Sequence, residues 1–278
     1  MGFMTRTHLS VRWTASWLLI SGLLFALTAC GSSSSGGGGG GGGQSTAAVF
    51  VADVTGAIYQ VSLDTGALTH VADSGVPDIY ALAYDSTTQK VFAGTGTSGV
   101  CEGCVYSLDL NTWQAAQISG ANDPIWDMTV PPTSGILYAL TNFECGDELG
   151  TIDKETGNRN GVGPACPGQY GLTHSADGSL YVAYDSAGAT LGVLDGGGNI
   201  VSGTAFSWAG PFSGGPSLIY EMAPHPTKDA FVGITDSNEL GVIDRCSAVV
   251  THLSSPGQTI TAVITVHSDP LPAPVPCG

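Results

Sequence analysis

Apolar and polar residues alternate along most of this chain in short runs that end at turn-forming residues. Glycine, threonine, serine and valine are plentiful, and charged residues make up only 11% of the sequence. No window of ten or more residues carries apolar side chains at the spacing of an amphipathic helix. The pattern therefore predicts an all-β protein made of many short strands.

The same strand pattern recurs roughly every 45 residues. One motif is a strand that ends in an aspartate, at Asp64, Asp109, Asp153, Asp195 and Asp244. A second motif lies between these strands and begins at Tyr80, Trp126, Tyr170, Tyr220 and Thr261. Each of the first four copies is followed by a turn and another strand. Four strands in each repeat are the sequence signature of a β-propeller blade.

The two ends of the repeat region complement each other. We name the strands of a blade A to D from the channel outward. Residues 260–266 form an A strand with nothing after it, whereas the chain begins with an unaccompanied B, C and D at 48–53, 57–63 and 68–71. Joining them predicts a five-bladed propeller over residues 47–269, closed by N-terminal strands that pair with the C-terminal strand. Residues 270–278 form a proline-rich tail.

Two phrases within the repeats point to a known kind of propeller. Ser179-Leu180-Tyr181-Val182-Ala183 and Leu240-Gly241-Val242-Ile243-Asp244 resemble the YVTN-type repeats of lactonase-like and quinoprotein-like propellers. The resemblance runs along the whole repeat region. It implies a propeller fold and adds lactone hydrolysis to the activities to be weighed.

The first 30 residues form a secretory signal. Arg6 and Arg12 precede an apolar run that begins at Trp17, and the run ends in Leu27-Thr28-Ala29-Cys30. This ending resembles a bacterial lipobox, which implies cleavage after residue 29 and attachment of acyl chains such as palmitate to Cys30. The alternative is an ordinary thiol at Cys30 in an uncleaved anchor. Residues 30–46, with glycine at every position from 36 to 43, form a flexible tether.

The lipobox resemblance and the charge together predict the location and partners of the protein. The lipobox implies a lipid-anchored protein of the cell envelope, and Gly31 implies the outer membrane in a Gram-negative cell. Loss of Arg6 and Arg12 changes the formal net charge from −16 to −18. A surface with this much negative charge repels nucleic acid and anionic lipid headgroups. We therefore expect no nucleic-acid partner, and contact with the membrane through the lipid anchor only.

Six cysteines remain after Cys30, as a disulfide framework in an oxidising compartment requires. In a propeller the B–C and D–A loops share one face, here called the top face, and the A–B and C–D turns share the bottom face. On this basis we predict the pairs Cys101–Cys104, Cys145–Cys166 and Cys246–Cys277. The alternatives are a redox centre at Cys101-Glu102-Gly103-Cys104 and a zinc site made from the four top-face cysteines.

The aspartates that end the hairpin strands are expected to serve turns. A carboxylate at such a position accepts hydrogen bonds from the backbone two residues on. One aspartate in each blade also places these groups too far apart to share a cation. We therefore predict no metal site and no cofactor.

The top mouth of the channel holds the candidate ligand-binding residues. Four A strands open with an aromatic residue, and two of these residues are followed by a carboxylate on what we expect to be opposite sides of the ring. The candidates are Tyr80, Trp126, Asp127, Tyr170, Tyr220 and Glu221. Aromatic faces beside acids suit sugars or organic cations, and packing between blades is the alternative role of the rings.

An aromatic insertion and three histidines have other expected roles. The insertion with Phe206, Trp208 and Phe212 is expected on the top face, as a recognition surface or a lid. His174, His225 and His267 are expected near bottom-face turns, in structural roles.

Two functions from different classes follow. The first is a binding or scaffold module that engages an envelope protein or a glycan through its top face, turned away from the membrane. The second is a carbohydrate-active or lactone-hydrolysing enzyme that uses Asp127 and Glu221 as an acid–base pair. The sequence contains no GxSxG, HExxH or phosphate-loop motif, which favours the binding module.

Overall fold

The computed structural model describes residues 47–97, 101–120, 123–143, 146–163, 168–185, 189–212 and 216–277. The predicted signal peptide, the lipidation site at Cys30 and the tether lie outside these residues. Among the residues that the structure describes, no helix is long and apolar enough to cross a membrane.

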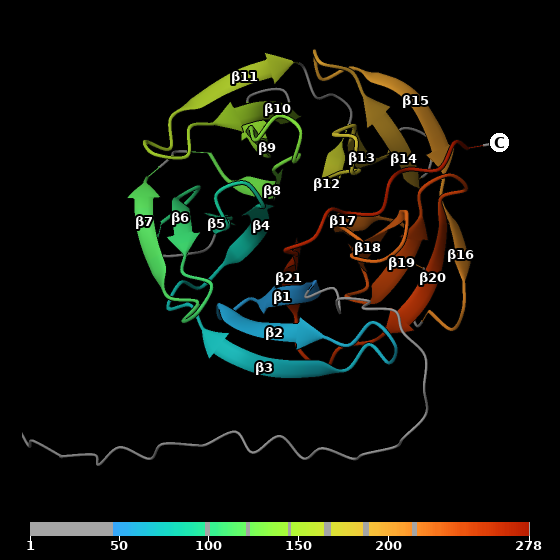
Figure 1. Ribbon diagram of the computed structural model, residues 1–278, viewed down its shortest axis with the longest axis horizontal. Coiled ribbons are helices and arrows are strands. Elements are labelled where there is room, and N and C mark those ends of the chain that lie inside the picture. The colour runs from blue at the N-terminus through green and yellow to red at the C-terminus, as the bar shows by residue number, and fades with distance from the viewer. Residues whose placement is uncertain are drawn as a thin grey trace, which may run out of the picture. The chain divides into compact units, whose positions relative to one another are not determined.

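Within these residues, twenty-one strands form five sheets arranged in a ring around a central channel, and all of their pairings except β16 with β20 are antiparallel (Figure 1). From the channel outward, blade 1 consists of β21 (Ile260–Val266), β1 (Ala48–Asp53), β2 (Ala57–Val61) and β3 (Leu68–Asp73). Blade 2 consists of β4 (Ile79–Asp85), β5 (Lys90–Thr95), β6 (Val105–Leu108) and β7 (Ala115–Ser119). Blade 3 consists of β8 (Ile125–Thr129), β9 (Leu137–Phe143), β10 (Gly146–Ile152) and β11 (Arg159–Gly163).

The last two blades follow the same order. Blade 4 consists of β12 (Gln169–His174), β13 (Leu180–Asp185), β14 (Ala189–Leu194) and β15 (Ile200–Ala205). Blade 5 consists of β17 (Ile219–Pro224), β18 (Ala230–Thr235), β19 (Leu240–Asp244) and β20 (Val249–Ser254), with β16 (Ser207–Ala209) on its outer edge. The prediction of an all-β, five-bladed propeller is confirmed.

The ring closes as the sequence predicts. Strand β21 pairs antiparallel with β1, from Ala48 opposite Val266 to Ala52 opposite Ala262. The last strand of the chain is thereby the innermost strand of the blade that the first strands begin. This pairing leaves no unpaired inner strand, which removes an edge on which other chains could assemble.

The hydrophobic core consists of five clusters, one at each junction between neighbouring blades. Ile79 and Leu82 of blade 2, for example, pack with Ile58 and Ile264 of blade 1. The other four clusters join blades 2 and 3, 3 and 4, 4 and 5, and 5 and 1 in the same manner. Inner strands contact a blade on either side, which explains why apolar residues outnumber polar ones in them.

The turn role of the hairpin aspartates holds for four of the five. Asp109, Asp153, Asp195 and Asp244 each accept hydrogen bonds from backbone N–H groups two to four residues later. Together with hydrogen bonds from nearby side chains, which are the largest cause at Asp153 (Thr156) and Asp244 (Ser247), these bonds hold the pKa of each carboxyl below its usual range.

The segment with Phe206, Trp208 and Phe212 does not lie on the top face, contrary to the sequence-based expectation. It contains β16, which runs parallel to β20 and extends blade 5 at its outer edge, beside the rim of the ring (Figure 1). All three rings pack against the cluster between blades 4 and 5. Their apolar surface is therefore used to join two blades, so they neither cover the mouth nor form a mobile lid.

Two of the three predicted disulfides are present, Cys101–Cys104 and Cys246–Cys277. Cys145 and Cys166 lie outside the described residues. Because Cys101 and Cys104 are bonded to each other, neither is a thiolate that could bind zinc. Arg159 of blade 3 fixes their loop by donating hydrogen bonds to Gly103 O (2.7 Å) and Asp123 O (2.8 Å).

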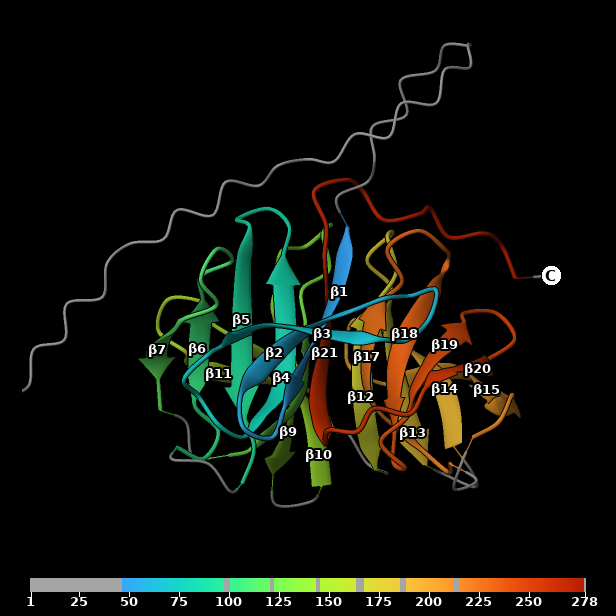
Figure 2. The same ribbon diagram turned by 90° about the horizontal axis from the view of Figure 1, so that it is seen from below.

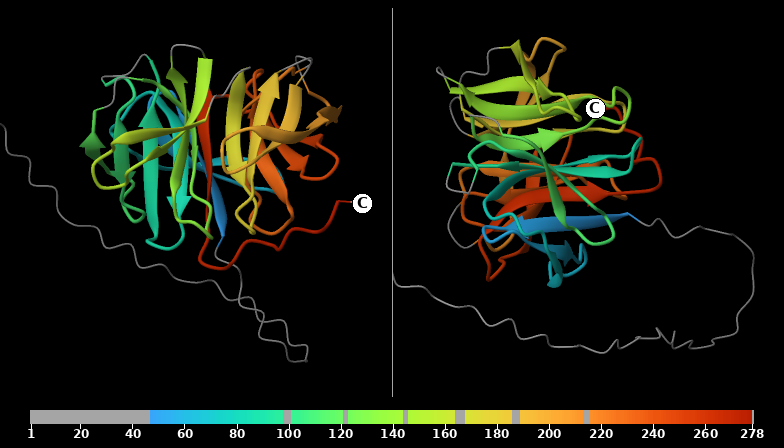
Figure 3. Two further views of the ribbon diagram at one scale, coloured as in Figure 1. Left: turned by 90° about the horizontal axis from the view of Figure 1, so that it is seen from above. Right: turned by 90° about the vertical axis from the view of Figure 1, so that its left-hand side faces the viewer.

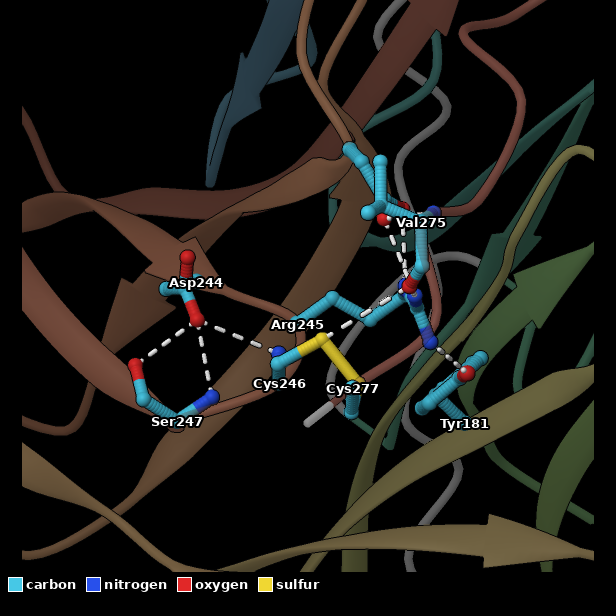
Figure 4. The surroundings of a disulfide bond; sticks show 8 residues. Tyr181, Asp244, Arg245, Cys246, Ser247, Val275 and Cys277 are labelled. Atoms are coloured by element: carbon cyan, nitrogen blue, oxygen red, sulfur yellow. Dashed lines mark hydrogen bonds and ion pairs between the residues drawn. A yellow bond between two sulfur atoms is a disulfide. The ribbon is translucent and has the colours of Figure 1, made fainter.

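The bottom face carries the beginning of β1 and the C-terminal tail (Figures 2 and 3). The tail leaves β21 at the channel and crosses this face to the outer edge of blade 5, where Cys277 is bonded to Cys246 (Figure 4). Arg245 pairs with Asp229 (2.7 Å) and donates hydrogen bonds to Tyr181 Oη and Val275 O. The tail is thus held by one covalent bond and by a partly buried arginine.

Candidate functional site

A pocket of about 540 Å³ opens at the top end of the channel. All four predicted rings line it, together with Glu221 and with polar residues that follow or precede the inner strands. The residues that line it include Tyr80, Trp126, Gln169, Tyr170, Tyr220, Glu221, Asp236 and Thr261. Asp127 lies beneath them and is fully buried. The structure therefore brings all six candidate ligand-binding residues together.

A β-bulge at the start of each inner strand places the rings in the mouth. Pairing between A and B strands shifts register at the aromatic position in blades 2, 3, 4 and 5. A bulge residue has no partner opposite it and its side chain is turned out of the regular alternation. The rings consequently point toward the channel instead of into the junctions between blades. In blade 1 the shift falls on Thr261, which also lines the pocket.

The rings form two edge-to-face pairs. Tyr80 and Trp126 have centroids 5.8 Å apart and planes at 89°, and Tyr170 and Tyr220 have centroids 5.4 Å apart and planes at 81°. Tyr220 is nevertheless 43% exposed. The rings thus contact one another and also present surface to the pocket, so packing and pocket lining are combined in the same residues.

A glycine makes room for one of these rings. A Cβ atom at Gly96, at the end of β5, would lie 2.6 Å from Cδ2 of Tyr80. That is closer than real Cβ contacts, so only glycine allows the ring to lie flat against this loop.

Asp127 and Glu221 do not face each other across an open channel, which corrects the sequence-based expectation. Although they come from the non-adjacent strands β8 and β17, their carboxyl groups are hydrogen-bonded to each other. The inner strands approach so closely below the mouth that the two side chains meet. The pair forms the floor of the pocket, with Glu221 on the pocket side.

One shared proton explains this contact, and the surroundings assign it to Glu221. Asp127 accepts hydrogen bonds from the backbone N–H groups of Met128 (2.6 Å), Leu172 (2.5 Å) and Met222 (3.3 Å). These donors stabilise the ionised form of Asp127, although burial raises its pKa. Burial and the neighbouring charge of Asp127 raise the pKa of Glu221 well above its usual value of 4.5. Glu221 is therefore the protonated member and Asp127 the charged one.

Three polar atoms of pocket-lining residues are buried without a hydrogen-bond partner. They are Trp126 Nε1, Gln169 Oε1 and Glu221 Oε2. An unpaired buried polar atom costs about 1–3 kcal/mol, so a ligand that pairs with these atoms gains that energy. Gln169 was not among the residues predicted from the sequence. Its position directly before the aromatic bulge residue of β12 is the signal that would have found it.

The histidines lie at the bottom end, and two of them line the channel. His174 and His267 border a cavity of about 20 Å³, which is large enough to hold one water molecule. A hydrogen bond joins His174 Nδ1 to Thr129 Oγ1 (2.7 Å), and His267 contacts Tyr84 edge to face. His225 has the expected turn role, because Thr227 N–H donates to its Nδ1 (3.2 Å).

Solved structures share this fold at low sequence identity. A chain from the crystal structure of a nidogen/laminin complex aligns with a TM-score of 0.56 and 12% identity, over 81% of this chain and all of that one. A gluconolactonase from Xanthomonas campestris aligns with a TM-score of 0.49 and 14% identity, over 76% and 73% of the two chains. At such identities the likeness concerns the fold alone. No protein-family model and no curated protein matches the sequence.

Proposed function

We propose that this protein is a lipid-anchored binding module of the bacterial cell envelope, and that it captures a small ligand in the pocket at the top of its propeller. The observation that carries the binding proposal is the pocket itself. A cavity of about 540 Å³ lies in the usual range for small-molecule sites, and it combines aromatic walls with unpartnered polar atoms.

The anchor proposal rests on the lipobox-like residues that end at Cys30 and on the direction of the strands. Strand β1 begins on the bottom face, opposite the mouth. A tether that joins it there turns the pocket away from the membrane and toward the surroundings. A ligand or an envelope protein that carries it as an exposed group can then reach the pocket.

Hydrolysis is the less favoured function. Glycosidases need about 5–9.5 Å between their two carboxyl groups to hold a sugar bond and a water or nucleophile. Asp127 and Glu221 are in direct hydrogen bond, and Asp127 is fully buried with both oxygens occupied. The pair serves better as a charged floor than as two catalysts acting on opposite sides of a bond.

Fluorescence titration tests the binding proposal. Purified protein is titrated with a panel of neutral sugars, alcohols, amines and carboxylates. Trp126→Phe should abolish the ligand-induced change in tryptophan emission, whereas Trp208→Phe, at the outer edge of blade 5, should retain it. If no compound changes the emission, or if Trp208→Phe removes the change while Trp126→Phe keeps it, the proposed pocket is wrong.

Cell fractionation tests the anchor. Replacement Cys30→Ser should leave the protein out of the membrane fraction and abolish incorporation of labelled palmitate. Membrane association and labelling that persist in this variant would contradict the lipid anchor without affecting the pocket.

A further inference from the structure

We propose that the ligand of the top pocket is an organic ammonium ion, bound by the aromatic walls and by the oxygen atoms of Gln169 and Glu221. This inference rests on the proposed binding function and specifies the chemical class of the ligand. Three independent features of the site support it, namely its charge, its walls and its unpartnered atoms.

The first feature is negative charge without a counterion. Among the described residues that line the pocket there is no lysine, arginine or histidine, whereas Asp236 lines it and the Asp127–Glu221 pair, which shares one proton, forms its floor. In the part of the chain that the structure describes, the ion pairs formed by lysine and arginine are Lys154–Asp85 and Arg245–Asp229, both away from the mouth. The charge of Asp127 is stabilised by backbone N–H groups and by the proton of Glu221, and none of these partners is a cation. A buried charge of this kind favours a cationic ligand and repels an anionic one.

The second feature is the set of rings. Three tyrosines and a tryptophan surround the opening. The face of an aromatic ring attracts a cation by about 0.5–2 kcal/mol, with tryptophan the strongest partner. Two edge-to-face pairs leave ring faces directed toward different sides of the pocket, as in sites that enclose an ammonium group.

The third feature is the kind of atom that lacks a partner. Gln169 is 2% exposed and Glu221 is 3% exposed, and each has one oxygen without a donor. The N–H groups of a protonated amine supply such donors and positive charge together. A sugar hydroxyl supplies the hydrogen bonds but not the charge. Trp126 Nε1–H is left to donate to an oxygen of the same ligand, as an amino alcohol or amino sugar would provide.

The proton on Glu221 links ammonium binding to pH. A cation beside the carboxyl pair favours the state in which Glu221 has lost its proton, so affinity should rise with pH. The titratable groups around Glu221 come from four inner strands and from the turn after β18. They are Asp127 of β8, Tyr80 of β4, Tyr170 of β12, Tyr220 of β17 and Asp236 after β18. None of them carries positive charge, so nothing in the pocket opposes the cation.

A matched pair of probes isolates the charge. Cyclohexylammonium and cyclohexanol have nearly the same shape, and an alkylamine stays protonated to about pH 9. We expect cyclohexylammonium to bind at least about tenfold more tightly, measured by Trp126 emission and calorimetry at pH 7 and pH 8. Glucose is the polyol comparison. If cyclohexanol or glucose binds as tightly as the ammonium, the inference is overturned while the proposed pocket stands. If none of the wider panel binds, both fail.

Two sets of variants identify the groups responsible. Glu221→Gln should weaken cyclohexylammonium by about fivefold at pH 8 and remove the rise of affinity with pH, with cyclohexanol unchanged. Glu155→Gln removes a carboxylate from an exposed bottom-face turn. It should change neither the affinity for cyclohexylammonium nor the dependence of that affinity on pH. Because Glu221 is buried, Tyr220→Leu serves as a second variant at an exposed position. It should weaken the ammonium by about fivefold, whereas Tyr220→Phe should stay within about twofold. Unchanged ammonium affinity in both Glu221→Gln and Tyr220→Leu would overturn the assignment.

Discussion

The two ends of the channel are built from the same five inner strands, but only the top end widens into a pocket within the channel. On the bottom face, a pocket of about 570 Å³ lies between the turns and the C-terminal tail. At the top, the bulge residues turn Tyr80, Trp126, Tyr170 and Tyr220 into a pocket of about 540 Å³. At the bottom, regular pairing continues to the strand ends and leaves a cavity of about 20 Å³. The difference lies in local pairing at one end of each strand, because the blades themselves are alike.

The bottom end is also covered by the chain. Leu271 of the tail is buried, and His267 Nδ1–H donates to Asp269 O (2.7 Å) at the point where the tail leaves β21. The disulfide Cys246–Cys277 fixes the far end of the tail. Polar groups at this end are enclosed by the protein, whereas those at the top end are left for a ligand. A position beside the channel is therefore not enough to make a residue part of the binding site. The residue must also be accessible to a ligand.

Removal of β21 should have the largest effect, because this strand contributes to both ends. A chain that stops at Pro256 lacks the inner strand of blade 1 and exposes an unpaired edge of β1. We expect it to aggregate and to show no cooperative unfolding by circular dichroism. A soluble, cooperatively folding protein of this length would mean that ring closure contributes little, and the two ends would then be independent.

Loss of the tail disulfide should lower the stability of the protein through its bottom end and leave ligand binding at the top end unchanged. A disulfide between residues separated by 31 positions stabilises a fold by about 3.7 kcal/mol, because it closes a loop in the unfolded chain. Cys277→Ser, with Cys246→Ser to avoid a free thiol, should lower the free energy of unfolding by about that amount in urea denaturation. Ligand binding at the top should stay within about twofold of wild type. A binding loss equal to that of Trp126→Phe would show that the tail supports the pocket.

Acidification should weaken the bottom end through His174. Burial lowers the pKa of this imidazole from 6.5 to about 3. The unfolded chain therefore takes up a proton below pH 6.5 that the folded protein does not, and stability falls by about 1.4 kcal/mol per pH unit from there toward pH 3. At pH 5 the loss is about 2 kcal/mol, measured by urea denaturation.

The comparison with His174→Asn isolates this contribution. Asparagine keeps a polar atom near Thr129 and does not titrate. His225, whose pKa burial lowers to about 4, acts in the same direction, and the raised pKa of Glu221 acts in the opposite direction. Both contributions are present in the variant as well and cancel in the difference. A difference between the two proteins that stays constant from pH 7 to pH 5 would contradict a neutral, buried His174.

The fold was predictable because propeller blades repeat their own signals. Each blade has a strand that ends in a turn aspartate such as Asp153, and the orphan strands at the two ends of the chain complement each other. The aromatic mouth was also predictable, since Tyr80 and its equivalents occupy one position in the repeat. Strong local patterns of this kind survive in a single sequence.

Contacts between blades could not be predicted. The contact between Asp127 and Glu221 depends on the width of the channel below the mouth. This width follows from the packing of all five blades. Gln169 is marked in the sequence only by its position before an aromatic residue of the repeat, and its importance comes from an oxygen that the fold leaves unpaired. The aromatic segment around Trp208 was misplaced because a three-residue edge strand, paired in parallel with β20, has too little sequence to show a pattern.

The smallest predicted effect is a loss of stability in Trp208→Ala, which distinguishes the aromatic segment of blade 5 from the aromatic residues of the mouth. Trp208 is half-buried between Phe206 and Phe212 on the outer edge of blade 5, and Trp126 is half-buried at the mouth. Replacement of a fully buried tryptophan by alanine costs about 3–5 kcal/mol, so Trp208→Ala should cost about 1–2 kcal/mol in urea denaturation. Its affinity for cyclohexylammonium should equal that of wild type, because β16 lies outside the pocket. If Trp208→Ala lost ligand affinity without losing stability, the outer edge of blade 5 would be a recognition surface after all, and the mouth would not be the sole binding region.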